Sequence, residues 1–215
     1  MSKKKIGILT GGGDVPGLNA VIKSVTYGAT ARGYEVVGIR RGWKGLVAPT
    51  WDQGRDADYF IDLNRDNTRT VDRTGGTFLH TSRTKPSKTK VADVPEHLQS
   101  RVGELDSPGE GLVDLTPVVL ENLERLGVDY LIPIGGDDTL SYGYHLHTQG
   151  VKVVAIPKTM DNDVPGTDYC IGFSTCVTRT IELTHALRTS AGSHERFLVI
   201  EVFGRYAGFT AVLPT

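Results

Sequence analysis

Four aspartates follow two apolar runs, and their number and spacing suit metal binding or acid–base chemistry. They are Asp137, Asp138, Asp161 and Asp163. Such a density of negative charge is unfavourable unless the carboxylates share a cation or a proton. Mg²⁺ prefers hard oxygen ligands and usually keeps waters and phosphate oxygens as well. The simpler alternative, that Asp137 and Asp138 cap a helix, is common for one such residue but leaves the second pair unexplained.

A glycine-rich loop, 11–17 with the sequence GGGDVPG, follows the apolar run 5–10. Glycines let backbone N–H groups approach an anion, and the helix expected next points its positive end at the same place. A tight turn between strand and helix is the alternative, although such a turn needs one or two glycines rather than three in succession. Because Leu18 stands where Walker A has lysine and Pro16 stands where G-x-G-x-x-G has its third glycine, the loop fits neither pattern.

Together these features indicate phosphoryl transfer, a reaction in which the protein mainly positions the reactants and neutralises charge. The glycine-rich loop would hold a phosphate, one aspartate would bind Mg²⁺, and a second would take the proton of the acceptor hydroxyl. Two cations, Arg83 and Lys158, would stabilise the charge on the transferred group.

Strands and helices are expected to alternate along the chain. The periodicity predicts strands over 5–10, 35–39, 130–134, 151–156 and 197–202. It predicts helices over 18–32, 117–126 with Thr116 as the cap, 140–149 and 174–190. We therefore predict an α/β fold of three layers, with a mostly parallel sheet between helices on both faces. The polar, proline-containing stretch 83–111 is expected to be a solvated surface insertion.

In open α/β sheets, ligands bind beyond the carboxyl ends of the strands. The loops that follow four of the expected strands are 11–17, 135–139, 157–163 and 203–205. If their strands are parallel neighbours, these loops meet at one edge of the sheet. This convergence supports a single site more strongly than any one motif does.

Composition and charge exclude several classes of protein. The 215-residue chain is 39% hydrophobic and 23% charged, with a formal net charge of −1, which excludes disorder and gives no overall field for nucleic acid or an anionic membrane. Its two cysteines, Cys170 and Cys176, match no zinc pattern and are interpreted as reduced core thiols. The apolar run 6–9 is too short for a signal peptide or a membrane span, so we expect a cytoplasmic protein.

Seven segments, in this order, resemble the phosphofructokinase family and cover nearly the whole chain. They are 7–19, 75–79, 82–83, 135–137, 159–163, 166–169 and 204–205. The Gly-Gly-Asp segment alone also occurs in NAD kinases and diacylglycerol kinases, but neither carries the Thr-x-Asp-Asn-Asp run. The resemblance implies a phosphofructokinase-like fold. Residues 1–172 would form the phosphoryl-donor and catalytic domain, and 173–215 would begin a second domain that binds the sugar phosphate.

The resemblance also implies a role for each matching residue, with fructose 6-phosphate as the acceptor and Mg²⁺ as the cofactor. Asp161 would be the general base for the C1 hydroxyl, and Asp137 the Mg²⁺ ligand. Residues implied to act on the phosphoryl donor or the transferred group are Gly12, Gly13, Arg83, Asp138 and Lys158. Residues implied to hold the sugar or its reacting hydroxyl are Thr159, Met160, Asp161, Asp163, Arg196, Phe203, Gly204 and Arg205.

Two of these implied roles have a further consequence. Arg196 would reach the sugar 6-phosphate in the site of a neighbouring subunit, which implies a homo-oligomer. Phe203 stands where the family has the methionine of a Met-Gly-Arg element. A backbone contact with the sugar would survive that change.

Asp138 and Lys158 bear on the identity of the donor. Relatives that use ATP typically carry glycine in place of Asp138, and many bacterial ones carry glycine in place of Lys158. A carboxylate at 138 would occupy and repel the region of a nucleotide's α-phosphate, whereas Lys158 adds charge that compensates a donor without adenosine. Thr84, after Arg83, offers no ring for adenine stacking. The pair is similar to that of pyrophosphate-dependent members, so we expect pyrophosphate as the donor, with ATP as the alternative.

Two other functions stay open at this point. A non-catalytic or regulatory relative usually loses its base or metal ligand, whereas this chain keeps Asp137, Asp161 and Arg83. A kinase for NAD or lipid is the weaker alternative, and sedoheptulose 7-phosphate is a close alternative acceptor. Because members of the family are longer than 215 residues, we expect this chain to be an N-terminal portion of the enzyme.

Overall fold

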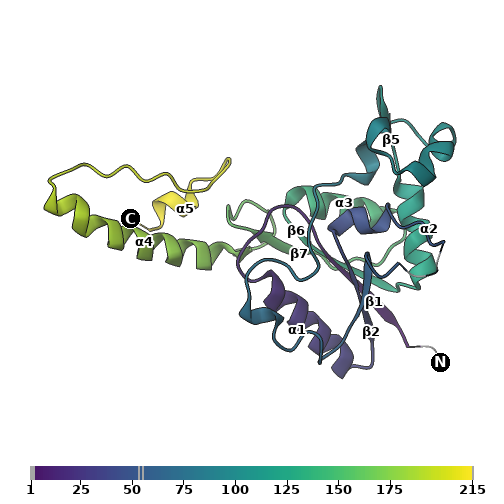
Figure 1. Cartoon of the computed structure of the whole chain (residues 1–215), viewed down its shortest axis with the longest axis horizontal. Coiled ribbons are helices and arrows are strands. Elements are labelled where there is room, and N and C mark those ends of the chain that lie inside the picture. The colour runs from purple at the N-terminus through teal and green to yellow at the C-terminus, as the bar shows by residue number, and fades with distance from the viewer. Residues whose placement is uncertain (1–2, 53, 55, 215) are drawn as a thin grey trace.

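A mixed, mostly parallel sheet forms the centre of the computed structural model, which describes residues 3–52, 54 and 56–214 (Figure 1). Across these residues the strand order is β3-β2-β1-β6-β7-β8. The strands are β1 (Lys5–Thr10), β2 (Glu35–Ile39), β3 (Phe60–Leu63), β6 (Tyr130–Gly135), β7 (Ile156–Thr159) and β8 (Ile171–Gly172). All neighbours run parallel except β2 and β3, which are antiparallel. The predicted α/β class with a mostly parallel sheet is therefore confirmed.

Helices cover both faces of the sheet, so β1 is buried on both sides. One face packs against α1 (Leu18–Ala31), and the other packs against α2 (Thr116–Leu126), α3 (Asp137–Thr148) and the 3₁₀ turn η1 (Gly42–Leu46). Successive side chains of a strand point to opposite faces. Ile8 therefore joins the core under α1 and Leu9 joins the core under α2 and α3, and each is 0% exposed.

The first part of the chain follows its periodicity closely. Strands β1 and β2 have the predicted bounds, and α1 ends at Ala31, one residue before the predicted end. Gly127, in the left-handed region with φ 67, ends α2 as predicted. The prediction that Thr116 caps this helix is wrong, because Thr116 is already its first residue. The carboxylate of Asp114 accepts the Thr116 N–H at 2.8 Å instead.

The strand predicted over 151–156 is wrong for most of its length. The N–H of Val151 donates to the Leu146 carbonyl at the end of α3, so the chain is still completing that turn. A single bridge between Val153 and Leu131 follows. The strand itself, β7, begins only at Ile156 and ends at Thr159, which places Lys158 inside the sheet rather than in the loop after it.

The strand predicted over 197–202 is also wrong, because that segment is not a strand in the structure. A strand needs a neighbour for its backbone groups, whereas this segment follows α4 (Phe173–Ser193), which projects away from the sheet (Figure 1). The side chains of Phe197 and Val199 are 104% and 93% exposed. The chain then returns toward the sheet, and Phe209 of the short α5 (Phe209–Val212) packs edge-on against Phe173, with ring centroids 6.4 Å apart.

The stretch 83–111 is only partly the solvated insertion that we expected. Val94 and Leu98 are each 5% exposed and join the core under α2. The stretch carries the 3₁₀ turns η3 (Pro86–Lys88), η4 (Val91–Asp93) and η5 (Glu96–Glu104). Its strand β4 (Thr89–Lys90) pairs antiparallel with β5 (Leu112–Val113). The remaining 3₁₀ turn, η2 (Val71–Arg73), lies earlier and contacts α1.

Within the described ranges, no helix combines the length and the apolar character that crossing a membrane requires.

Candidate active site

Three of the four predicted loops lie at the same edge of the sheet. They follow β1, β6 and β7, which are parallel and adjacent. The loop 11–17 follows β1, α3 begins two residues after β6 ends, and 160–163 follows β7. The fourth loop, 203–205, follows no strand in the part of the chain that the structure describes.

The glycine-rich loop is held by backbone contacts on two sides. The Gly11 N–H donates to the Ile134 carbonyl at 2.9 Å, and the Gly12 N–H donates to the Ser82 carbonyl at 3.1 Å. The hydroxyl of Thr81 donates to the Gly12 carbonyl at 2.8 Å. Gly12 has φ 80, a conformation that favours glycine. The Gly12 amide, implied to contact the donor, is thus already engaged with Ser82.

The segment that carries Arg83 is anchored by two buried polar side chains. Asn19 of α1 accepts the Phe78 N–H at 2.6 Å and donates to the Thr74 carbonyl at 3.0 Å. The hydroxyl of Thr10, the last residue of β1, donates to the His80 carbonyl at 2.8 Å. Asn19 and Thr10 therefore position the chain up to Arg83 beside the glycine-rich loop. Sequence reasoning included both residues in matching segments without giving either a role.

Thr139 of α3 fills the space that glycine leaves free at the ends of β1 and β6. A Cβ at Gly11 would lie 2.5 Å from the Thr139 hydroxyl oxygen, and a Cβ at Gly135 would lie 2.3 Å from the Thr139 Cβ. Thr139 is 4% exposed and cannot move aside easily. Glycine at these two positions therefore lets α3 begin close to the strand ends.

Replacing Gly135 with alanine is expected to lower the free energy of unfolding by about 1–3 kcal/mol, because the new methyl group overpacks the helix–sheet contact. Thermal or denaturant unfolding followed by circular dichroism measures the change. Gly13→Ala is the matched control, since no atom lies within 4 Å of a Cβ there and its φ is not positive. Equal stability of the two variants would contradict the proposed close approach.

Lys158 supports the glycine-rich loop from inside the sheet. Its side chain is buried, with 3% of the residue exposed, and its ammonium donates to the Gly13 carbonyl. Burial lowers the pKa of Lys158; the charge of Asp14 opposes this shift and the charge of Arg83 adds to it. A Cβ on Gly12 would lie 3.3 Å from the Lys158 Nζ. Lys158 thus contacts the glycine-rich loop directly and lies near enough to Arg83 for the two positive charges to interact.

Asp161 carries a buried carboxylate oxygen that has no hydrogen-bond partner within the described residues. The residue is 8% exposed, and its Oδ1 receives no hydrogen bond from any group that the structure describes. Its backbone N–H donates to the Thr159 hydroxyl at 3.1 Å. Buried polar atoms are nearly always hydrogen-bonded, and an exception has a specific cause, such as backbone strain, a catalytic role or a bound water or ion. An unpaired carboxylate oxygen can accept a proton from a substrate hydroxyl.

Asn162 fixes the loop that presents Asp161. It adopts φ 53, in the left-handed region that asparagine tolerates. Its Oδ1 accepts the Cys170 N–H at 2.8 Å, and its Nδ2 donates to the Asp168 carbonyl at 3.0 Å. Asn162 lies in the matching segment 159–163, and the sequence alone indicated no role for it. Its position between two aspartates, at a turn directly after a strand, was the available signal for a structural role.

Asp137 and Asp138 begin α3, and the structure contradicts the alternative that they cap it. The cap residue is Gly136, and no side chain makes a capping hydrogen bond. Both aspartates are exposed. Asp138 forms an ion pair with Lys85, with its Oδ1 2.9 Å from the lysine Nζ. Lys85 belongs to the stretch 83–111 that we expected to be a solvated insertion, and its partner lies 53 residues away in the chain.

Asp137 is suited to bind a Mg²⁺ ion that is also coordinated by phosphate oxygens. No group of three or more metal-ligating side chains occurs among the residues described here, so these residues do not form a complete protein cage. Mg²⁺ at phosphate sites typically needs only one or two carboxylates, with water and phosphate oxygens completing its shell. An exposed Asp137 at the strand edge matches that donor set.

The other residues implied to bind the sugar lie in two places. Thr159 and Met160 are half-buried beside Asp161, and Asp163 is exposed in the same loop. Burial raises the pKa of the Cys170 thiol, and a hydrogen bond with the Val164 backbone opposes this shift. The negative charge of Asp163 raises the same pKa further, so Asp163 lies near that thiol.

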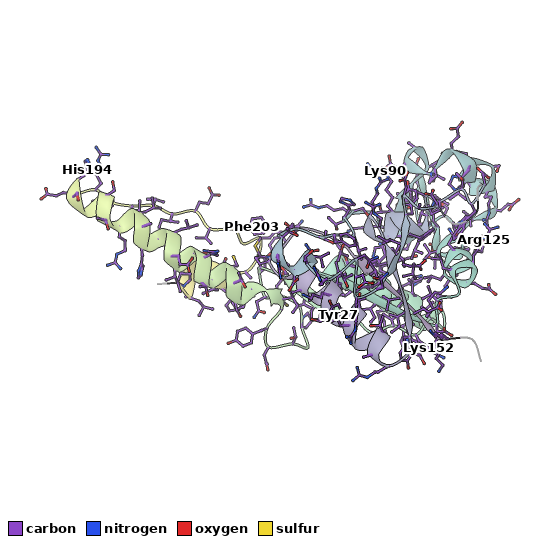
Figure 2. All side chains as sticks on the ribbon, turned by 60° about the horizontal axis from the view of Figure 1, so that its bottom comes forward. Tyr27, Lys90, Arg125, Lys152, His194 and Phe203 are labelled. Atoms are coloured by element: carbon purple, nitrogen blue, oxygen red, sulfur yellow. The ribbon has the colours of Figure 1, made fainter. Side chains whose placement is uncertain are left out.

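Arg196 and the segment 203–205 lie outside the strand-edge cluster. The Arg196 N–H donates to the Ala191 carbonyl at 3.0 Å, which places Arg196 at the far end of α4, next to His194 at its tip (Figure 2). Phe203 lies nearer the sheet, where the chain returns, and its carbonyl accepts the Thr210 hydroxyl at 2.5 Å (Figure 2). A Cβ on Gly204 would lie 2.5 Å from the Ala207 carbonyl oxygen. The Arg205 guanidinium carbon lies over the Tyr206 ring, 5.2 Å from its centroid. The structure therefore does not bring Arg196 to Asp161 within one chain.

Comparison with solved structures supports the fold. The chain superposes on phosphofructokinase from Pichia pastoris in the T-state with a TM-score of 0.76 and 26% identity, covering 99% of this chain and 20% of that one. It also superposes on pyrophosphate-dependent phosphofructokinase from Marinobacter aquaeolei with a TM-score of 0.65 and 21% identity, covering 98% of this chain and 48% of that one. The fold is thus phosphofructokinase-like, as the sequence predicted.

Sequence comparison extends this likeness. The chain is 40% identical to ATP-dependent 6-phosphofructokinase 3 from Streptomyces coelicolor over 209 residues. It is 42% identical, also over 209 residues, to pyrophosphate–fructose 6-phosphate 1-phosphotransferase from Amycolatopsis methanolica. Each match covers 97% of this chain and 52% of the relative, so the chain spans about half the length of these relatives. The family model described as phosphofructokinase matches residues 5–214, and the chain therefore belongs to the phosphofructokinase family.

Proposed function

We propose that this chain supplies the donor-binding and catalytic part of a phosphotransferase that acts on the C1 hydroxyl of fructose 6-phosphate. The observation that carries the proposal is the buried Oδ1 of Asp161, which lies two residues after β7 and has no hydrogen-bond partner among the described residues. Lys158 lies within that strand, and its ammonium donates to the Gly13 carbonyl of the glycine-rich loop. A proton acceptor and a candidate phosphate site therefore lie at the ends of neighbouring strands.

In the proposed reaction, the C1 oxygen of the sugar attacks a phosphorus atom of the donor. The bond between that phosphorus and the bridging oxygen breaks, and the proton of the C1 hydroxyl passes to the Asp161 carboxylate. With pyrophosphate as the donor, the leaving group is orthophosphate. Arg83 and Lys158 stabilise the negative charge on the transferred group, and the loop containing Gly12 and Gly13 positions the donor.

Asp137 would hold Mg²⁺, which neutralises phosphate charge when bound. For the acceptor, Thr159, Met160 and Asp163 adjoin the base and would position the reacting hydroxyl. We propose that residues 1–172 form the donor and catalytic domain, and that 173–215 begin the domain that binds the sugar phosphate. Arg196, Phe203, Gly204 and Arg205 belong to this second part.

The position of Arg196 at the far end of α4 supports its proposed role in the site of a neighbouring subunit. The far end of α4 lies away from the sheet of its own chain (Figure 1). Another copy of the protein would bring its own strand-edge cluster to that arginine. We therefore propose a homo-oligomer in which Arg196 contacts the sugar 6-phosphate across an interface.

We further propose that the donor is pyrophosphate. The names of the relatives include both ATP-dependent and pyrophosphate-dependent enzymes, so the preference rests on this chain's own residues. Asp138 is exposed in the first turn of α3, where its carboxylate would oppose the α-phosphate of a nucleotide. The Lys158 ammonium offers positive charge beside the loop to a donor that carries no nucleoside.

Initial rates with fructose 6-phosphate, Mg²⁺ and either pyrophosphate or ATP test this function. We expect turnover with pyrophosphate and at least a tenfold lower kcat/KM with ATP, a difference of about 1.4 kcal/mol. Turnover with ATP but none with pyrophosphate would overturn the choice of donor. Because the chain spans about half the length of its relatives, the assay uses the whole protein in which the chain occurs, and no turnover of that protein with either donor would overturn the proposed activity itself.

A further inference from the structure

The segment 81–85 connects the two parts of the site that face a phosphoryl donor. At one end, Thr81 and Ser82 hold both backbone groups of Gly12. At the other end, the Lys85 Nζ lies 2.9 Å from the Asp138 Oδ1 at the start of α3. One short segment thus links the glycine-rich loop to the carboxylate that would discriminate between donors.

The Lys85–Asp138 pair is accessible to solvent. The side chains are 56% and 70% exposed, respectively. Neither makes a second ion pair with another residue in the described part of the chain. Exposed pairs of this kind contribute little to stability. The same two charges can still change how strongly the site attracts an anionic donor, because the donor experiences the electrostatic potential of all the charges around the site.

We propose that Lys85 is a specificity-determining residue that acts through Asp138, an inference that rests on the proposed function. By neutralising the carboxylate, Lys85 sets how strongly this edge of the site repels an anionic donor. The repulsion is greatest for a nucleoside triphosphate, whose additional phosphate would extend toward Asp138. Removing the lysine therefore weakens use of ATP more than use of pyrophosphate and sharpens the preference.

A double-mutant cycle on the whole protein in which this chain occurs tests this coupling. The four proteins are the unsubstituted chain, Lys85→Met, Asp138→Asn and the double variant, each assayed at low salt with both donors. We expect Lys85→Met to raise the donor KM by about two- to fivefold, with the larger rise for ATP. The same change made in the Asp138→Asn background should alter the donor KM by less than about 1.5-fold.

Two further measurements separate this role from a merely structural one. The KM for fructose 6-phosphate should not change in Lys85→Met, and the effect on the donor KM should shrink as salt is added. Lys88→Met is the matched control, because Lys88 is exposed three residues further along and forms no ion pair with any residue that the structure describes. Its donor KM should match that of the unsubstituted protein.

Each other outcome is decisive. An equal effect of Lys85→Met in both backgrounds shows that Lys85 contacts the donor directly and overturns the coupling. No effect in either background overturns it as well, as does an equal rise in the KM for both substrates. Absence of turnover in the unsubstituted protein with both donors instead overturns the proposed function, which distinguishes the two failures.

Discussion

Replacing Asp161 with asparagine is expected to lower kcat by about 10²–10⁴-fold, while the KM for fructose 6-phosphate changes by less than about threefold. The amide has nearly the same shape as the carboxylate but cannot accept the proton of the C1 hydroxyl. The Asp161 Oδ1 is buried without a hydrogen-bond partner among the described residues, so the substitution removes no described contact of that atom. Steady-state kinetics measure both parameters, and thermal unfolding confirms that the variant is folded.

Asp168→Asn is the matched control for this prediction. Asp168 is an exposed aspartate of the same loop, and its contact with Asn162 uses only the backbone carbonyl. Its kcat should stay close to that of the unsubstituted protein. A near-normal kcat in Asp161→Asn would remove Asp161 from the chemistry, and a large rise in the sugar KM would show that it mainly binds the sugar.

Lys158→Met is expected to lower kcat/KM for the donor by about 10²-fold, because it removes a positive charge from the site of transfer. The same variant is expected to be at least as stable as the unsubstituted protein at neutral pH. Burial lowers the pKa of Lys158, so holding the ammonium charged costs free energy in the folded state. A buried charged side chain that lowers the stability of the folded state is typical of functional sites.

The pH dependence of this stability difference follows from the direction of the shift. The lowered folded-state pKa means that the unfolded chain binds more protons between that pKa and the ordinary value of 10.5. The cost of charging Lys158 is therefore fully present below the folded-state pKa, and it is relieved as the pH rises through this window. The stability gained in Lys158→Met should be largest near neutral pH and should diminish toward pH 10.5.

Denaturant unfolding at several pH values checks this trend. Lys152→Met is the control, since Lys152 is exposed on the segment before the same strand and its ammonium lies 5.4 Å from the Tyr130 ring. A Lys158→Met variant that keeps its donor kinetics would contradict the proposed role. A loss of stability at neutral pH would show instead that the Gly13 contact outweighs the cost of burying the charge.

The sequence predicted the part of the site that depends on chain order. Alternating strands and helices, with glycine or aspartate within two residues of the ends of β1, β6 and β7, are enough to place three loops at one sheet edge. The unpaired oxygen of Asp161 was not predictable, because it depends on burial by surrounding residues. The Lys85–Asp138 pair joins residues 53 positions apart, a distance at which sequence periodicity gives no information.

The failed strand predictions have a similar cause. The apolar residues 197–202 have the composition of a buried strand, but a strand also needs a neighbour, and the structure leaves this segment exposed beside α4. The segment 151–156 is apolar too, yet its first N–H completes the turn at the end of α3. In both cases tertiary context, rather than local pattern, decides whether a strand forms.

Phosphorus NMR of one reaction mixture tests the central claim most directly. The mixture contains the protein, Mg²⁺, fructose 6-phosphate and pyrophosphate. We predict that the pyrophosphate signal falls while orthophosphate and a new phosphate ester at C1 of the sugar appear in equal amounts. Release of orthophosphate without the C1 ester, or a pyrophosphate signal that stays constant while added ATP is consumed, would contradict transfer from pyrophosphate to the sugar.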